Sequence, residues 1–145
     1  MSTRAVRLRR EDFSCFYPVT TRWGDHDSYG HVHNVVYYSF FDSAISQFLV
    51  ESGTLDIGCS PVIGLIAASN CTYHASITFP ERVTVGLRIA HLGNSSARYE
   101  LGVFREDDEQ ASATGEVVYV YVDRQSQRAA RIPAPIREEL ASLAV

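Results

Sequence analysis

Ionisable side chains crowd into residues 22–34, RWGDHDSYGHVHN, directly before the most apolar stretch of the chain. Asp25 and Asp27 stand two positions apart, so in an extended segment both carboxylates point the same way. One of them could therefore face a site as a general base or as a nucleophile. Gly30 permits a sharp turn and the close approach of a ligand. The spacing indicates acid–base or covalent chemistry at a turn.

The same residues also have a purely structural interpretation. Asp and Asn before a helix are most often N-terminal caps, and spacing alone favours capping over catalysis. The histidines His26, His31 and His33 resemble a metal cluster, but no third ligand of firm spacing follows the His31–His33 pair. We expect partly exposed loop histidines there, and neither a metal ion nor a cofactor.

The segment that follows predicts a helix from Asn34 to Ser52. Tyr37, Phe41 and Phe48 repeat at helical spacing, and further apolar residues widen the stripe beyond what a surface helix needs. Such a helix is expected to be buried over most of its circumference. Tyr37 is expected to pack in the core first and to line a ligand second. The N-terminus of this helix presents unpaired N–H groups and a partial positive charge, which suit a developing oxyanion.

Alternating and apolar segments predict a sheet around that helix. The expected strands are residues 16–23, 61–79 with a bulge at Gly64, 82–93, 97–105 and 115–123, and residues 132–143 form a closing helix. This order indicates an α+β fold in which an antiparallel sheet wraps around the buried helix.

Length and charge bound the class of protein. The 145 residues predict one domain, 1–145, with residues 1–13 as a loosely ordered leader. A net charge of −4 argues against broad nucleic-acid binding. All thirteen basic residues are arginines, so Schiff-base chemistry on a lysine and a P-loop lysine are excluded. No apolar run reaches the about 18 residues that a membrane span needs.

Several site motifs lack their signals in this chain. Cys15, Cys59 and Cys71 are widely spaced and form no CxxC pair, which predicts neither a structural zinc site nor a disulfide framework. Cytoplasmic localisation fits these cysteines best. Neither GxSxG nor a GxGxxG after a strand occurs, so serine-hydrolase and dinucleotide-binding interpretations have no support.

Residues 23–44, WGDHDSYGHVHNVVYYSFFDSA, resemble the signature of the 4-hydroxybenzoyl-CoA thioesterase-like branch of the hotdog-fold superfamily. The shared pattern is D-x-D-x-x-G-H-V, then an Asn, a Tyr, a bulky apolar pair and an acidic residue. The later strands and the IPAPIREEL tail also match, so the resemblance covers roughly residues 14 to 143, with an uncertainty of about 2–4 residues at the ends. Many relatives read G-H-V-N-N, whereas this chain has His33 in place of the first Asn.

The resemblance implies a hotdog fold, in which a curved antiparallel sheet wraps one long central helix. It implies homodimers or homotetramers with active sites at the subunit interface. It places the catalytic carboxylate at Asp27 and the carbonyl-polarising N–H at Asn34. Gly30 would hold the turn between them, and His31, His33 and Tyr37 would line the substrate. The change to His33 is expected to alter substrate or orientation rather than abolish activity.

The expected activity is that of an acyl-CoA thioesterase, which hydrolyses a thioester to a free acid and CoA. Asp27 would act as base or nucleophile on an acyl-CoA or acyl-carrier-protein thioester; the sequence does not choose between either pair. A hotdog hydratase or dehydratase and a non-catalytic acyl-binding module are the alternatives. No arginine is singled out for the CoA phosphates among the candidates Arg82, Arg88, Arg98, Arg128 and Arg131.

Overall fold

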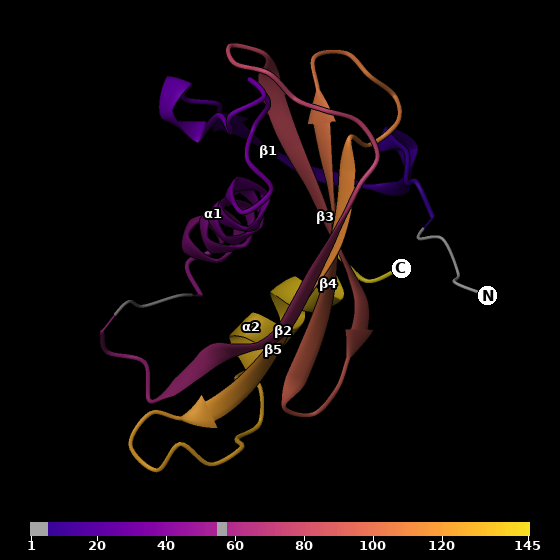
Figure 1. Ribbon diagram of the computed structural model, residues 1–145. Helices are drawn as coiled ribbons and strands as arrows, with labels where there is room; N and C mark the ends of the chain where they lie inside the picture. Colours follow the sequence, from indigo (N-terminus) through magenta and orange to yellow (C-terminus); the bar gives the residue numbers. More distant parts are fainter. Residues whose placement is uncertain (1–5, 55–57) are drawn as a thin grey trace, which may run out of the picture.

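The computed structural model describes residues 6–54 and 58–145. In chain order its elements are β1 (Cys15–Thr20), α1 (Val36–Glu51), β2 (Val62–Tyr73), β3 (Arg82–Leu92), β4 (Ser96–Arg105), β5 (Ala113–Asp123) and α2 (Ala134–Ala141). The strands form one antiparallel sheet in the order β1-β3-β4-β5-β2. The helix α1 lies against one side of this sheet (Figure 1). The predicted α+β plan is confirmed.

The central helix packs by one face rather than all round. Its buried side chains recur every three or four residues from Tyr37 to Leu49 and form one apolar core with the inner sides of the strands. Phe41 fits over Gly115, where an added Cβ would lie 2.5 Å from the Phe41 ring. Tyr38 and Val50 are exposed on the other face. The expectation of burial over most of the circumference is therefore wrong for the single chain, because the sheet covers one side only.

Strand β2 differs from its predicted form in two ways. It ends at Tyr73 instead of residue 79, and residues 74–81 form a loop that leads to β3. The irregularity in its pairing with β5 lies between Ile66 and Ala68, not at Gly64. Gly64 serves close packing instead, since a Cβ there would lie 3.1 Å from the Tyr119 ring.

The chain before β1 is ordered from the point at which the structure describes it. Phe13 is buried and forms a second apolar cluster with Phe104 and Ala111 on the outer face of the sheet. Its ring fills the space above Gly86 and Gly102, which stand opposite each other on β3 and β4. The prediction of a loosely ordered leader is therefore wrong for residues 7–13, while residues 1–5 lie outside the described part. Figure 1 shows this segment and α1 on opposite sides of the sheet.

The edge of the sheet at β2 is open. Most residues of this strand are exposed, including the apolar Leu65 and Ile66. Its backbone pairs with β5 on one side and with no described strand on the other. Among the described helices, none has the length and apolar character required to cross a membrane.

Candidate active site

The segment before α1 is fixed from within by Asp25. This carboxylate is 3% exposed and accepts hydrogen bonds from the Arg22 backbone N–H at 2.8 Å and from the Arg22 guanidinium at 2.9 Å. The Asp25 carbonyl accepts the His33 N–H at 2.8 Å. The polar atoms of Asp25 are therefore engaged in hydrogen bonds that hold this segment in place.

Asp27 closes a tight turn and keeps one oxygen free. Its Oδ1 accepts the N–H groups of Tyr29 at 2.8 Å and His31 at 3.1 Å. Gly30 completes the turn with a φ of 78°, a conformation that favours glycine. The His31 and Tyr29 amides, in that order, hold the pKa of Asp27 below its ordinary value, and the nearby His31 and His33 add to this effect. Oδ2 makes no hydrogen bond to the described residues and is available to a ligand.

At the start of α1 the backbone N–H of Asn34 is available to a ligand. The His33 carbonyl accepts the Val36 N–H at 2.9 Å, and its ring Nδ1 accepts the Val35 N–H at 3.3 Å, so His33 holds the turn that leads into α1, whose N-cap Val35 has no side-chain capping bond. The Asn34 carbonyl accepts the Tyr73 hydroxyl at 2.9 Å. Within the described part of the chain the N–H of Asn34, which directly precedes the N-cap Val35, has no acceptor.

Asp27 and Asn34 meet at one cavity of about 320 Å³. His31 and Tyr37 also line it, whereas His33 does not. Tyr37 is 2% exposed, with its ring edge-on to Tyr73 at 5.0 Å, and burial raises its pKa to about 12. Tyr37 is therefore a neutral wall of the cavity and a member of the core. Four of the predicted residues, Asp27, His31, Asn34 and Tyr37, thus line one cavity, and His33 instead holds the turn into α1.

The loop after β2 brings residues to the cavity that sequence patterns did not reveal. Tyr73, His74 and Ser76 line it opposite Asp27. The His74 ring contacts the Thr114 hydroxyl at 3.0 Å, and burial, followed by the charge of Arg7, lowers the pKa of His74. These residues lie within the apolar segment predicted as one long strand. They were missed because the apolar pattern does not reveal that the strand ends at Tyr73.

Other candidate groups are engaged elsewhere or unsuited to the chemistry. The His26 ring accepts the Phe79 N–H at 2.9 Å. Burial raises the pKa of the Cys71 thiol to about 11, which keeps it protonated at neutral pH. Within residues 6–54 and 58–145, no three His, Cys, Asp or Glu side chains are grouped as metal ligands.

A larger cavity, about 520 Å³, lies between α1, the first half of β2 and β5. Its lining is mostly apolar and includes Leu49, Ile63 and Tyr119, with Asp42 and Arg124 among the few charged groups. It contains no His or Cys side chain among the described residues. The smaller cavity combines a carboxylate with a free backbone N–H and is therefore the candidate reactive site. The larger cavity is suited to an apolar group.

The arrangement at the smaller cavity suits attack on a carbonyl. A carboxylate oxygen is available beside a backbone donor at a helix start, where partial positive charge accumulates. Such a donor stabilises an oxyanion as it forms.

Comparison with known proteins gives a match to a family model and matches to solved structures. The model of the thioesterase-like superfamily matches residues 21–140. The PA5185 protein of Pseudomonas aeruginosa is 49% identical, with 96% of this chain and 97% of that chain covered and a TM-score of 0.93. The PA2801 protein of Pseudomonas aeruginosa, a proposed thioesterase, is 28% identical over 85% of this chain and 95% of its own, with a TM-score of 0.79.

A DHNA-CoA thioesterase from Staphylococcus aureus shares the fold. It is 21% identical over 88% of this chain and 87% of its own, with a TM-score of 0.77. No curated protein matches the sequence. The likeness of these structures confirms the predicted hotdog architecture, and the family match confirms the predicted kinship with thioesterases.

Proposed function

The chain belongs to the thioesterase-like superfamily, and from this membership we propose that it is an acyl-CoA thioesterase that hydrolyses a thioester to a free acid and CoA. The observation that carries the proposal is the meeting of the free Asp27 oxygen and the unpaired Asn34 N–H at one cavity. The names of related folds, among them the DHNA-CoA thioesterase, are consistent with it.

The mechanism uses these two groups in turn. In one form, Asp27 Oδ2 takes a proton from water, the water oxygen bonds to the thioester carbon, and the carbonyl oxygen gains charge beside the Asn34 N–H. Collapse of this intermediate breaks the C–S bond, and the leaving thiolate takes up the proton. In the other form, Oδ2 attacks the carbon directly, the C–S bond breaks, and the CoA thiolate leaves and takes up a proton from water. A second water then hydrolyses the mixed anhydride to the free acid and restores the Asp27 carboxylate. Both forms need an ionised Asp27.

The surrounding residues position the substrate. Gly30 keeps the turn that orients Asp27, and His33 holds the turn into α1 through the Val35 N–H. His31 and Tyr37 line the cavity where the acyl carbonyl would lie. The family's usual Asn is replaced by a ring that still accepts a hydrogen bond, so the helix start is kept.

A thiol-release assay tests the proposal. Purified protein is offered a panel of aliphatic and aromatic acyl-CoAs with a chromogenic thiol reagent, and release of free CoA above the uncatalysed rate is expected for at least one of them. A change in enoyl absorbance without thiol release would indicate the hydratase alternative. Saturable binding without either signal would indicate an acyl-binding module and would contradict the proposed hydrolysis.

We further propose that the protein, one domain in the cytoplasm, works as a homodimer paired through β2. A long open edge with exposed apolar residues is a template for pairing with another strand. A two-fold pairing of identical strands must be antiparallel about a shared midpoint. Residues 62–66 of one subunit would then lie beside residues 69–73 of the other.

This pairing would join the two cavities. The larger apolar cavity lies along residues 62–66, and Tyr73 lines the smaller cavity at the other end of the strand. In the dimer the apolar cavity of one subunit would adjoin the reactive cavity of the other. The acyl group would lie in the first and its thioester carbonyl in the second.

A further inference from the structure

The segment before β1 lies beside the candidate site, although it precedes the residues that match the family model. Its backbone runs along the chain that leads into β5: the Ala111 N–H donates to the Leu8 carbonyl at 2.9 Å, and the Arg10 N–H to the Glu109 carbonyl at 2.8 Å. The His74 N–H donates to the Ser112 carbonyl at 2.8 Å in the same region. The segment is thereby fixed next to the loop that lines the reactive cavity.

Arg7 points toward that loop, whereas its neighbours point away. Val6 and Leu8 line a separate cavity of about 230 Å³ on the outer face of the sheet. Between them, Arg7 donates from Nε to the Ala111 carbonyl at 2.8 Å. Its charge acts on His74, a lining residue of the reactive cavity, and contributes to the lowered pKa of that imidazole.

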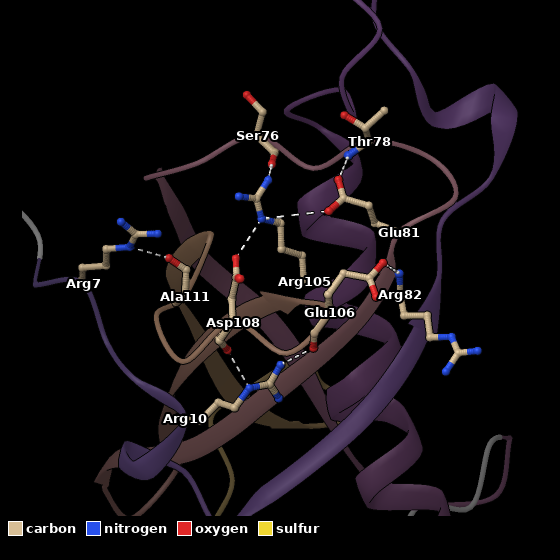
Figure 2. A network of polar contacts seen from close by, with 10 residues as sticks. All are labelled: Arg7, Arg10, Ser76, Thr78, Glu81, Arg82, Arg105, Glu106, Asp108 and Ala111. Carbon is tan, nitrogen blue, oxygen red and sulfur yellow. Dashed lines mark hydrogen bonds and ion pairs between the residues drawn. The ribbon is translucent and has the colours of Figure 1, made fainter.

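The two terminal nitrogens of the Arg7 guanidinium are available to a ligand. Among the described residues they have no partner, and residues 1–5, MSTRA, carry no acidic side chain. Figure 2 shows the Arg7 guanidinium held at Ala111 by one nitrogen, with its other two directed away from the residues drawn. Arg10, by contrast, uses its nitrogens on Asp108, Thr84 and Glu106.

The other arginines near the sheet are less suited to an anion at this cavity. Arg88 is paired with Glu100 at 3.2 Å and lies over the Phe13 ring. Arg82 is on β3, three strands from β2, or roughly 14 Å at the usual strand spacing. Arg128 follows β5, at the end of the sheet opposite Tyr73.

We propose that Arg7 binds a phosphate group of coenzyme A, the thiol carrier of the proposed substrate. The inference rests on the proposed function and names a binding group for that same site. A guanidinium forms paired hydrogen bonds to phosphate oxygens, and anchoring at Nε leaves its two terminal nitrogens oriented for such a contact. A position near His74 but outside the cavity lining suits the phosphates, because the pantetheine chain separates them from the reacting sulfur.

The test compares Arg7→Gln with the wild-type protein on two thioesters of the same acyl group. On acyl-CoA the substitution is expected to raise KM by about 10-fold with kcat unchanged, since a charge-assisted hydrogen bond is lost. On the N-acetylcysteamine thioester, which has no phosphate, neither constant is expected to change. The 3′-dephospho-CoA thioester identifies the phosphate: loss of the difference assigns the 3′-phosphate, and its persistence assigns the diphosphate. Arg128→Gln is the matched control and should behave as wild type on both substrates.

Failure of the inference is distinguishable from failure of the proposed function. An active enzyme whose KM for acyl-CoA does not respond to Arg7→Gln, or responds equally on the N-acetylcysteamine thioester, would overturn the phosphate site alone. If no thioester is hydrolysed, calorimetry with desulfo-CoA decides: binding weakened about 10-fold by Arg7→Gln supports the site, and equal or absent binding overturns it.

Discussion

Asp25 and Asp27 stand two positions apart and have different tasks. Asp25 is buried and engages both oxygens with Arg22, whereas Asp27 uses one oxygen for the turn and presents the other to the cavity. Accessibility thus separates the two aspartates: Asp25 holds the chain, and Asp27 is the one that the proposed chemistry can use. Side-chain type alone could not make this division.

Asp27→Asn is expected to lower kcat on acyl-CoA by at least about 10²-fold, the usual contribution of a positioned base. The amide oxygen can still accept the Tyr29 and His31 N–H groups, so the turn should persist. Asp123→Asn is a matched control, because Asp123 holds a similar turn through the N–H groups of Gln125 and Ser126. Steady-state kinetics check this expectation, and a fully active Asp27→Asn enzyme would show that the carboxylate is dispensable.

The pH profile of the same enzyme follows from the lowered pKa of Asp27. The proposed mechanism needs the ionised form, and the backbone N–H groups of His31 and Tyr29 stabilise it. The ordinary pKa of an aspartate is 3.8, and the Asp27 carboxylate therefore remains mostly ionised at that pH. The acid limb of the kcat/KM profile should lie below pH 3.8. Brief assays after a pH jump measure the limb. A limb near pH 6 would assign the essential base to another group.

Tyr73→Phe tests how the oxyanion donor is held. The Tyr73 hydroxyl donates to the Asn34 carbonyl and so orients the peptide unit at the helix start. Loss of one such hydrogen bond is worth about 0.5–1.5 kcal/mol, so kcat should fall about 2- to 10-fold. Tyr38→Phe removes a hydroxyl from the exposed face of α1 and should leave kcat unchanged. Equal effects of both substitutions would argue against a specific role of Tyr73.

At the scale of elements, the loop 74–81 is held from outside the site by Arg105. Figure 2 shows this guanidinium between the Ser76 carbonyl, at 2.9 Å, and Asp108, at 2.8 Å. Glu81 lies at the edge of the same group, 4.0 Å from Arg105, and accepts the Thr78 N–H at 2.8 Å. The end of β4 thereby positions the loop that carries His74 and Ser76.

Arg105→Met should loosen that loop without unfolding the sheet. Amide hydrogen exchange within residues 74–81 is expected to accelerate about 5- to 10-fold, because the lost hydrogen bonds are partly exposed and individually weak. Arg137→Met is the control, since Arg137 donates in the same manner to the Gly93 carbonyl at 2.8 Å. Exchange that rises equally throughout β3–β5 would mean global destabilisation instead.

The contact of α1 with the sheet depends on Gly115. An added Cβ would lie 2.5 Å from both the Asn70 carbonyl oxygen and the Phe41 ring, and the backbone atom cannot move aside. Gly115→Ala should therefore cost about 3 kcal/mol and lower Tm by about 10 °C. Gly24→Ala meets no atom within 4 Å and should leave Tm nearly unchanged. Calorimetric melting of both variants tests the pair, and an unchanged Tm for Gly115→Ala would show that helix and sheet are not in tight contact.

At the scale of the whole molecule, periodicity was sufficient to predict the elements but not their neighbours. The expected strands correspond to β1–β5, and the helix predicted at 34–52 is α1, because alternation and helical spacing are local properties of the sequence. The strand order and the packing of Phe13 over two glycines are not local. They depend on the register of β3 and β4, which brings Gly86 opposite Gly102.

Only the part of the candidate site that lies before α1 could be predicted from the sequence. Asp27 and Asn34 belong to a single short segment, whose pattern resembles a known signature. His74 comes from a distant part of the chain and lies at the same cavity as that segment, and Arg7 lies near His74 rather than near the segment itself. A carbonyl-binding turn can therefore be recognised in the sequence, whereas the groups around it depend on tertiary structure.

The assembly is the last and largest-scale prediction. If β2 is the dimer interface, a charge within it should separate the subunits, because a buried unpaired carboxylate is costly. Ile66→Asp is expected to sediment as a monomer and to lose most thioesterase activity, since the acyl cavity of the second subunit is removed. Val50→Asp is the matched control, because Val50 and Ile66 are both 51% exposed and Val50 is on α1. It should retain the β2 dimer. Sedimentation equilibrium also distinguishes a dimer from a tetramer, and a wild-type protein that is monomeric at assay concentration would contradict the pairing through β2.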